Sequence, residues 1–482
     1  MIQLLSRPLR TMRLSVRGRN RPAAGERRAP WSRALAPDGA SGILDRVSPA
    51  CRGGSLRSRR FATPMFLFRL WLGLLLCIPA AGAEEWTTED VYTRHQDSVV
   101  QVRIIDARGG AKRSIGSGFM VSDDGRLVTN FHVVADFVHH PADHRAEWHG
   151  SDGSSGALEL LDVDVVHDLA LMQSDALAGR KFLAVESNLP KMGERIFALG
   201  FPYDLGLTIV EGTYNGLLEK SLYERIHLTA SINPGMSGGP AIDRNGNVIG
   251  VNVATAGDQV SFLVPARHVI DLLLRDEAAT RGELMDRIGA QLRANQARYL
   301  GELMQKPFAT VSLGGYQVPA AIARFVSCWS QTDQDQERLY DHTELSCQSE
   351  DDVFLSGDLT TGSIRYEHEL RSARKVGLLR FWNQMERSFA SFYGELGGDR
   401  STVTDFQCHS DFLDESGIKR KLMLCVRRYR EFEGLYDLVQ RQVTLDNELR
   451  SLQSTLILTG VDREQGIRFA RRFVDGIRWE QP

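Results

Sequence analysis

The most informative segment of this 482-residue chain reads Asn233-Pro234-Gly235-Met236-Ser237-Gly238-Gly239-Pro240. On its own, a glycine-rich segment with one serine is usually only a turn. Glycine adopts unusual φ/ψ values without a Cβ penalty, so this segment can curl tightly around Ser237. A tight curl aims several backbone N–H groups at one point, which is the arrangement that stabilises an oxyanion. Ser237 is therefore a candidate nucleophile.

Two earlier segments supply the partners that such a serine needs. They read Thr129-Asn130-Phe131-His132-Val133-Val134 and His167-Asp168-Leu169-Ala170-Leu171-Met172. A lone histidine beside an apolar strand is usually structural, and an aspartate before a strand is usually a turn or cap residue. A nucleophilic hydroxyl, however, needs a base to take its proton, and the base needs an acid to fix its tautomer. Together the three segments predict a triad of His132, Asp168 and Ser237.

The surrounding chain favours β structure. Between about residues 92 and 264, short apolar runs alternate with Gly, Asn and Asp. Regular spacing of such strands is typical of an all-β barrel or sandwich. Helical periodicity then predicts helices over residues 265–275 and about 280–305.

These motifs resemble a trypsin-fold serine protease, and more narrowly the HtrA/Deg family of exported proteases. The resemblance covers about 95–275 and also includes Ser117-Gly118-Phe119, Gly200-Phe201-Pro202, Gly206-Leu207-Thr208 and Val260-Ser261-Phe262-Leu263-Val264-Pro265. It implies two β-barrels with the active site between them. His132 would be the general base, Asp168 would orient it, and Ser237 would form an acyl-enzyme. Gly235, Met236 and Ser237 would form the oxyanion hole, with N–H donors from Gly235 and Ser237.

The resemblance also implies a specificity pocket. In trypsin-like relatives the residue six before the nucleophile lies at the base of the pocket, and here it is Ser231. A serine in place of an aspartate disfavours cleavage after Lys or Arg. Ile232, Val253 and Ala254 would line a modest apolar pocket, which predicts cleavage after small or medium apolar residues. Residues 251–255 would pair with the extended backbone of an unfolded or flexible substrate.

The N-terminal segments predict export. Residues 1–64 contain 14 Arg and no Lys, and we expect either a disordered extension or a mis-assigned start before Met65. Residues 65–83 have an arginine, a short apolar core and small residues before Ala83, which predicts a signal peptide, with an uncleaved anchor as the alternative. The predicted location is the periplasm. The apolar core is shorter than the roughly 18 residues that span a bilayer, which argues against the anchor. No stable membrane span is expected once the signal peptide is cleaved.

Residues after about 310 form a separate region, where no PDZ pattern is apparent. Cys408 follows Cys328 by 80 residues and Cys425 follows Cys347 by 78. A Glu-Leu-Arg-Ser tetrapeptide recurs after 79 residues. We interpret these offsets as a diverged duplication, with chance repetition as the alternative. The preferred pairing of the four cysteines is Cys328–Cys347 and Cys408–Cys425, one of three connectivities.

The predicted architecture is therefore mainly β, with a trypsin-like double β-barrel followed by a disulfide-containing, duplicated α+β domain. The expected domains are 84–278 (protease), 279–310 (helical linker), 311–395 (first repeat) and 396–482 (second repeat).

No cofactor or metal is expected. His140 and His144 have the i, i+4 spacing of zinc ligands, but Pro141 argues against a helix between them. The partners expected are protein or peptide substrates, and a protein bound by the C-terminal region. Nucleic acid is not expected, because the chain after residue 83 is acidic.

The leading functional hypothesis is an exported serine endopeptidase. Two alternatives remain at this point. One is a binding protein or chaperone that keeps a protease scaffold, and the other is a regulated protease with one target recognised by the C-terminal region.

Overall fold

The computed structural model describes residues 86–480, apart from 256, 258, 276–279, 334–338, 391–395, 416 and 446–448. The predicted extension 1–64 and signal peptide 65–83 lie outside these residues. In the part of the chain that is described, no helix has both the length and the apolar character needed to cross a bilayer.

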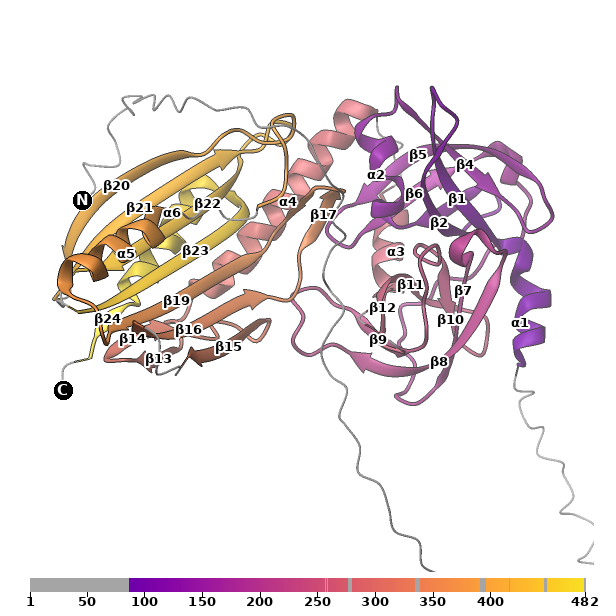
Figure 1. Cartoon of the computed structure of the whole chain (residues 1–482). Coiled ribbons are helices and arrows are strands. Elements are labelled where there is room, and N and C mark those ends of the chain that lie inside the picture. Colours follow the sequence, from indigo (N-terminus) through magenta and orange to yellow (C-terminus); the bar gives the residue numbers. More distant parts are fainter. Residues whose placement is uncertain are drawn as a thin grey trace, which may run out of the picture. The chain divides into compact units, whose positions relative to one another are not determined.

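Two closed six-stranded barrels follow helix α1 (Thr88–His95), as Figure 1 shows. The first has the strand order β1-β2-β3-β6-β5-β4, and the second β10-β11-β12-β9-β8-β7. The first barrel contains β1 (Val99–Asp106), β2 (Lys112–Met120), β3 (Arg126–Thr129), β4 (His144–His149), β5 (Ser155–Asp164) and β6 (Leu169–Gln173). The second contains β7 (Arg195–Gly200), β8 (Thr208–Leu217), β9 (Ile226–Thr229), β10 (Pro240–Ile242), β11 (Val248–Thr255) and β12 (Ser261–Pro265). The predicted double barrel is confirmed.

Three helices accompany the barrels: α2 (Phe131–His139), α3 (Ala266–Leu273) and α4 (Arg281–Leu303). The last two match the predicted helices to within about two residues at each end, which is the usual ambiguity of helix boundaries. Helix α4 begins with a capping box, in which Thr280 N–H donates to Glu283 at 2.8 Å. Its first half contributes Ile288 to a core shared with the first barrel, and its second half contributes Tyr299 to the core of the C-terminal region.

The C-terminal region is built on a seven-stranded antiparallel sheet with the order β15-β16-β19-β23-β22-β21-β20. A three-stranded sheet β13-β14-β24 and the hairpin β17-β18 complete it, with helices α5 (Leu378–Ala390) and α6 (Arg463–Asp475). The strands are β13 (Thr310–Leu313), β14 (Tyr316–Pro319), β15 (Val326–Asp333), β16 (Tyr340–Ser349), β17 (Val353–Ser356), β18 (Leu359–Thr361), β19 (Ile364–Ala373), β20 (Gln407–Glu415), β21 (Ile418–Arg428), β22 (Leu435–Thr444), β23 (Arg450–Asp462) and β24 (Arg478–Trp479).

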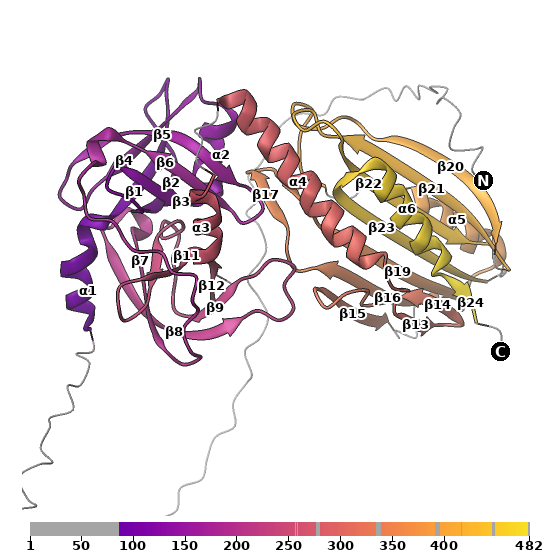
Figure 2. The ribbon, with the colours of Figure 1, turned by 180° about the vertical axis from the view of Figure 1, so that it is seen from behind.

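Helices α5 and α6 cover opposite faces of this sheet, as Figures 1 and 2 show from the two sides. Gln453, which pairs with Glu369 in the register, donates to the carbonyl of Met385 on α5 at 3.0 Å. The neighbouring His368 instead stacks on Phe473 of α6, with ring centroids 5.4 Å apart. Successive residues of a strand point to opposite faces, so the central strands β22 and β23 of this sheet are buried on both sides.

Two disulfides join the cysteines in the predicted pairs. Cys328 and Cys347 are directly opposite each other on β15 and β16, and Cys408 and Cys425 are directly opposite each other on β20 and β21. Each disulfide therefore ties an edge strand of the seven-stranded sheet to its neighbour. Strands from residues 311–395 and from residues 396–482 belong to this same sheet.

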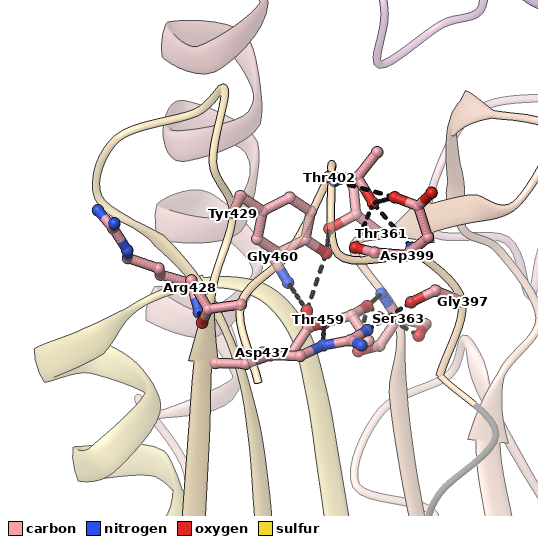
Figure 3. A network of polar contacts seen from close by, with 12 residues as sticks. Thr361, Ser363, Gly397, Asp399, Thr402, Arg428, Tyr429, Asp437, Thr459 and Gly460 are labelled. Carbon is pink, nitrogen blue, oxygen red and sulfur yellow. Dashed lines mark hydrogen bonds and ion pairs between the residues drawn. The ribbon is translucent and has the colours of Figure 1, made fainter. Parts of the chain in front are cut away.

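A buried polar network connects the sheet to the β17-β18 hairpin (Figure 3). At its centre Asp437 accepts hydrogen bonds from Arg427 Nε (2.7 Å), the Tyr429 hydroxyl (2.8 Å) and Gly460 N–H (3.0 Å). The Tyr429 hydroxyl also lies 2.9 Å from Thr361 Oγ1, at the end of β18. The end of the hairpin is thus attached to the part of the sheet formed by β21, β22 and β23.

We predict that Asp437→Ala destabilises the C-terminal region by about 3–5 kcal/mol, because it leaves the guanidinium of Arg427 buried without its partner. Urea denaturation of the full chain measures the effect. Asp405→Ala is the matched control, since the Arg400–Asp405 pair is exposed, and it should change stability by less than about 0.5 kcal/mol. Equal losses in the two variants would contradict the prediction.

Candidate active site

Two neighbouring strands of the first barrel bring His132 and Asp168 together. Strands β3 and β6 pair in antiparallel register, with Thr129 opposite Ala170. His132 lies three residues beyond the end of β3, and Asp168 immediately precedes β6, so both emerge at the same end of the barrel. The predicted pair is therefore positioned by strand pairing, although 36 residues separate its members in the sequence.

Asp168 holds His132 at two points. Its Oδ2 lies 2.7 Å from His132 Nδ1, and its Oδ1 accepts the His132 backbone N–H at 2.9 Å. Asp168 has φ +60°, a left-handed conformation that is uncommon for a residue with a side chain. Its carbonyl accepts from the Asn130 side chain (2.8 Å) and from Phe131 N–H (3.2 Å), which secures this conformation.

The charge of Asp168 favours the protonated form of His132. Burial would lower the pKa of His132, but the charge of Asp168 and its hydrogen bond to the ring outweigh burial and raise this pKa above its ordinary value. The positive charge of Arg225 opposes the rise. The His132 side chain remains 30% exposed, so the edge of the ring that does not face Asp168 is within reach of a substrate.

Ser237 lies in a loop whose backbone conformation requires glycine at two positions. Gly235 and Gly238 have φ +96° and +85°, and each lies against backbone. A Cβ on Gly235 would be 2.4 Å from the carbonyl oxygen of Phe201, and a Cβ on Gly238 would be 2.2 Å from that of Ser117. Both glycines are thus required by conformation and by space.

The first barrel fixes this loop through Ser117 on β2. The N–H of Ser117 donates to the Ser237 carbonyl at 2.8 Å, and its hydroxyl donates to the Gly235 carbonyl at 2.7 Å. The neighbouring Gly116 lies against both Ser237 and the residue after His132, because a Cβ there would be 3.1 Å from the Ser237 carbonyl oxygen and 2.5 Å from Val133. Ser237 therefore lies beside the start of α2, where His132 is found.

The Ser237 hydroxyl donates to the carbonyl of Val253 at 3.5 Å, a long hydrogen bond. Within the described residues, no hydrogen bond joins it to His132. Nucleophile–base hydrogen bonds are often loose without substrate and tighten when substrate binds.

The loop leaves two N–H groups available for an oxyanion. Met236 N–H donates to Asn233, and Gly238 N–H donates to Asn252. Within the described residues the N–H groups of Gly235 and Ser237 have no hydrogen-bond partner. Of the three residues predicted to form the oxyanion hole, these two can donate, while Met236 is buried and shapes the loop.

The predicted specificity residues differ in their surroundings. Ser231 is exposed, and Ile232 is buried in a core cluster of the second barrel. Val253 is partly buried, and its carbonyl accepts from Ser237. The side chain of Ala254 lies outside the described part of the chain.

One residue beside the site has no counterpart in the sequence motifs. Phe354 of β17 lies edge-to-face against His132, with ring centroids 6.1 Å apart. It follows His132 by 222 residues and is part of the C-terminal region. No local pattern predicts such a contact, because it depends on tertiary packing alone.

Comparison with known proteins identifies the barrels. Residues 116–251 match the trypsin-like peptidase domain family. The chain is 32% identical over 193 residues to serine protease HTRA1 of Xenopus laevis, which is 37% of this chain and 41% of that protein. It is 33% identical over 192 residues to a probable periplasmic serine endoprotease, DegP-like, of Brucella suis, which is 36% of each chain. The chain thus spans about two fifths of the length of these relatives.

Among solved structures, the serine endoprotease from Yersinia pestis matches with 27% identity and a TM-score of 0.35, over 40% of this chain and 68% of that one. The domain match and the sequence relatives confirm the predicted resemblance: the two barrels are similar to the trypsin-like peptidase domain and to HtrA and DegP-like serine proteases.

We predict that His132 titrates above the ordinary histidine value of about 6.5, because Asp168 stabilises its charged form. In Asp168→Asn the charge is lost, and the pKa of His132 should fall. NMR titration of the His132 ring protons measures both values. The exposed Asp143→Asn is the control and should leave the pKa of His132 unchanged. An unchanged pKa in Asp168→Asn would contradict the prediction.

Proposed function

We propose that this chain is an exported serine endopeptidase, with residues 84–278 as its protease domain. The observation that carries the proposal is the junction of the barrels, where the Asp-oriented His132 lies beside Ser237. In this loop the N–H groups of Gly235 and Ser237 have no hydrogen-bond partner among the described residues. The match to the trypsin-like peptidase domain supports the same chemistry.

The proposed reaction begins when a substrate carbonyl lies against Ser237. The serine hydroxyl turns from Val253 to His132 and gives its proton to Nε2 as Oγ attacks the carbonyl carbon. The hydrogen bond between Asp168 and Nδ1 keeps the other ring nitrogen free to accept that proton, and the carboxylate stabilises the imidazolium.

The negative charge on the carbonyl oxygen is then stabilised by the N–H groups of Gly235 and Ser237, which need no reorganisation. When the C–N bond breaks, His132 donates its proton to the departing amine and an acyl-enzyme remains. A water molecule gives a proton to His132 as its oxygen attacks the acyl carbon. The bond between the acyl carbon and Ser237 Oγ then breaks, His132 returns the proton to Oγ, and the acid is released.

The substrate proposed is an extended segment of an unfolded or flexible protein. Beyond Asn252, the described residues of β11 pair only with β12, through Ala254–Phe262 and Thr255–Ser261. The other edge of β11 is then open for backbone pairing with a peptide. Cleavage after small or medium apolar residues is proposed because Ser231 carries no charge to attract Lys or Arg.

The proposed location is the periplasm, which rests on the signal-like segment 65–83 and on the relatives named as periplasmic. The proposed domain boundaries after the protease domain are 279–310, 311–395 and 396–482. A protein partner of the C-terminal region is proposed in place of the PDZ domains of the family.

A fluorophosphonate probe should label the protein at Ser237, because the probe reacts with activated serine hydroxyls. Ser237→Ala should abolish labelling, and His132→Ala should lower its rate by at least about 10³-fold. Ser151→Ala is the control, since this serine lies in an exposed turn of the first barrel, and it should label like wild type.

Mass spectrometry of the labelled peptide identifies the site. Absence of labelling between pH 6 and 9 would contradict the proposal. Full complementation of a deletion strain by Ser237→Ala would favour the alternative, a protease scaffold used only for binding.

A further inference from the structure

Phe354 is placed against His132 by packing on the helix that carries this histidine. Its neighbours Val353 and Leu355 are both 1% exposed and belong to a core cluster that also contains Phe131 and Val138 of α2. At the end of α2, His139 Nε2 donates to the carbonyl of Leu355 at 2.9 Å. Strand β17 is thus held along the length of α2.

The same segment also holds the second barrel. The carboxylate of Asp351 accepts hydrogen bonds from the Ser221 hydroxyl (2.8 Å) and from Leu222 N–H (2.5 Å), in the loop between β8 and β9. Residues 351–355 therefore contact α2 after the first barrel and the β8–β9 loop of the second barrel. The network around Asp437 fixes the end of the hairpin through Thr361.

Phe354 differs from its neighbours in exposure. Val353 and Leu355 enter the shared core, while Phe354 packs against this core and remains partly exposed. The Phe354 side chain is partly buried, and its ring lies edge-to-face with the His132 ring. It therefore adds apolar surface beside the reacting groups.

We propose that Phe354 forms an apolar wall of the substrate cleft, which receives an apolar side chain of the substrate next to the scissile bond. This inference rests on the proposed protease function. A general base must lie beside the scissile bond, so a residue in contact with His132 faces the substrate residue that passes over this histidine. Selectivity at that position is then determined by the C-terminal region and not by the barrels.

The experiment compares peptides that carry either Leu or Gly at one of two positions. The first position is the residue before the one that supplies the scissile carbonyl, and the second is the residue that follows the scissile bond. Phe354→Ala should lower kcat/KM about 10-fold or more for the Leu peptides at one of these positions, chiefly through KM. It should change kcat/KM for the matching Gly peptides by less than about 2-fold. Phe354→Leu should restore most of the selectivity, because it keeps apolar volume.

Phe412→Ala is the matched control, since Phe412 lies on β20 and is 67% exposed. It should leave kcat/KM unchanged for all peptides. Thermal unfolding of each variant tests the fold, and Phe354→Ser provides a second truncation if the alanine variant unfolds.

Three outcomes would overturn the inference. An equal loss for Leu and Gly peptides would mean that Phe354 acts only on His132, and an equal gain would mean that the ring blocks the cleft. Unchanged selectivity would mean that it does not touch substrate. Failure of the wild-type protein to react with the fluorophosphonate would remove the proposed function and this inference together, whereas labelling with unchanged selectivity removes only the inference.

Discussion

Ser117 is the residue on which the geometry of the site depends. It is fully buried on β2 of the first barrel, and each of its polar atoms has a partner. Its N–H and hydroxyl donate to the loop of Ser237, and the same hydroxyl accepts from Phe201 N–H of the second barrel at 2.9 Å. Its carbonyl accepts from Thr129, at the end of the strand that leads to His132. One serine thus fixes the position of the nucleophile loop relative to the strand that leads to His132.

Through helix α2, the C-terminal region also contributes to the position of His132. His132 lies in its first turn and His139 in its last, and nine residues of helix form a rigid connection. His139 contacts both the Leu355 carbonyl and the carboxylate of Glu431, which belong to the C-terminal region. The orientation of His132 is therefore supported from the first barrel by Asp168 and from the C-terminal region through α2.

Local patterns predicted most of this architecture. The residues around His132, Asp168 and Ser237 carry their own signatures, because each needs a particular backbone at its position. The helices after the barrels were predictable from periodicity and from the cap at Thr280. The cysteine pairs were predictable because cysteines that face each other across adjacent strands of a hairpin lie close in sequence.

Contacts that depend on tertiary packing were not predictable. Phe354 belongs to no sequence motif. The pairing of Asp437 with Arg427 likewise becomes apparent only in the folded structure. The repeated tetrapeptide shows how a sequence offset can differ from structural equivalence. Residues of the two copies face each other across β19 and β23, where Arg371 lies opposite Ser451 in the register. The proposed duplication therefore rests on the two cysteine hairpins at opposite edges of the sheet.

The core cluster behind α2 sets an order of events during synthesis. It joins Val134 and Trp148 of the first barrel to Val403 and Leu435, which leave the ribosome much later. Until those residues have been made, the first barrel lacks part of its apolar lining and His132 lacks the ring of Phe354. A chain cut before Val403 would therefore leave apolar side chains of the first barrel behind α2 without part of their packing partners.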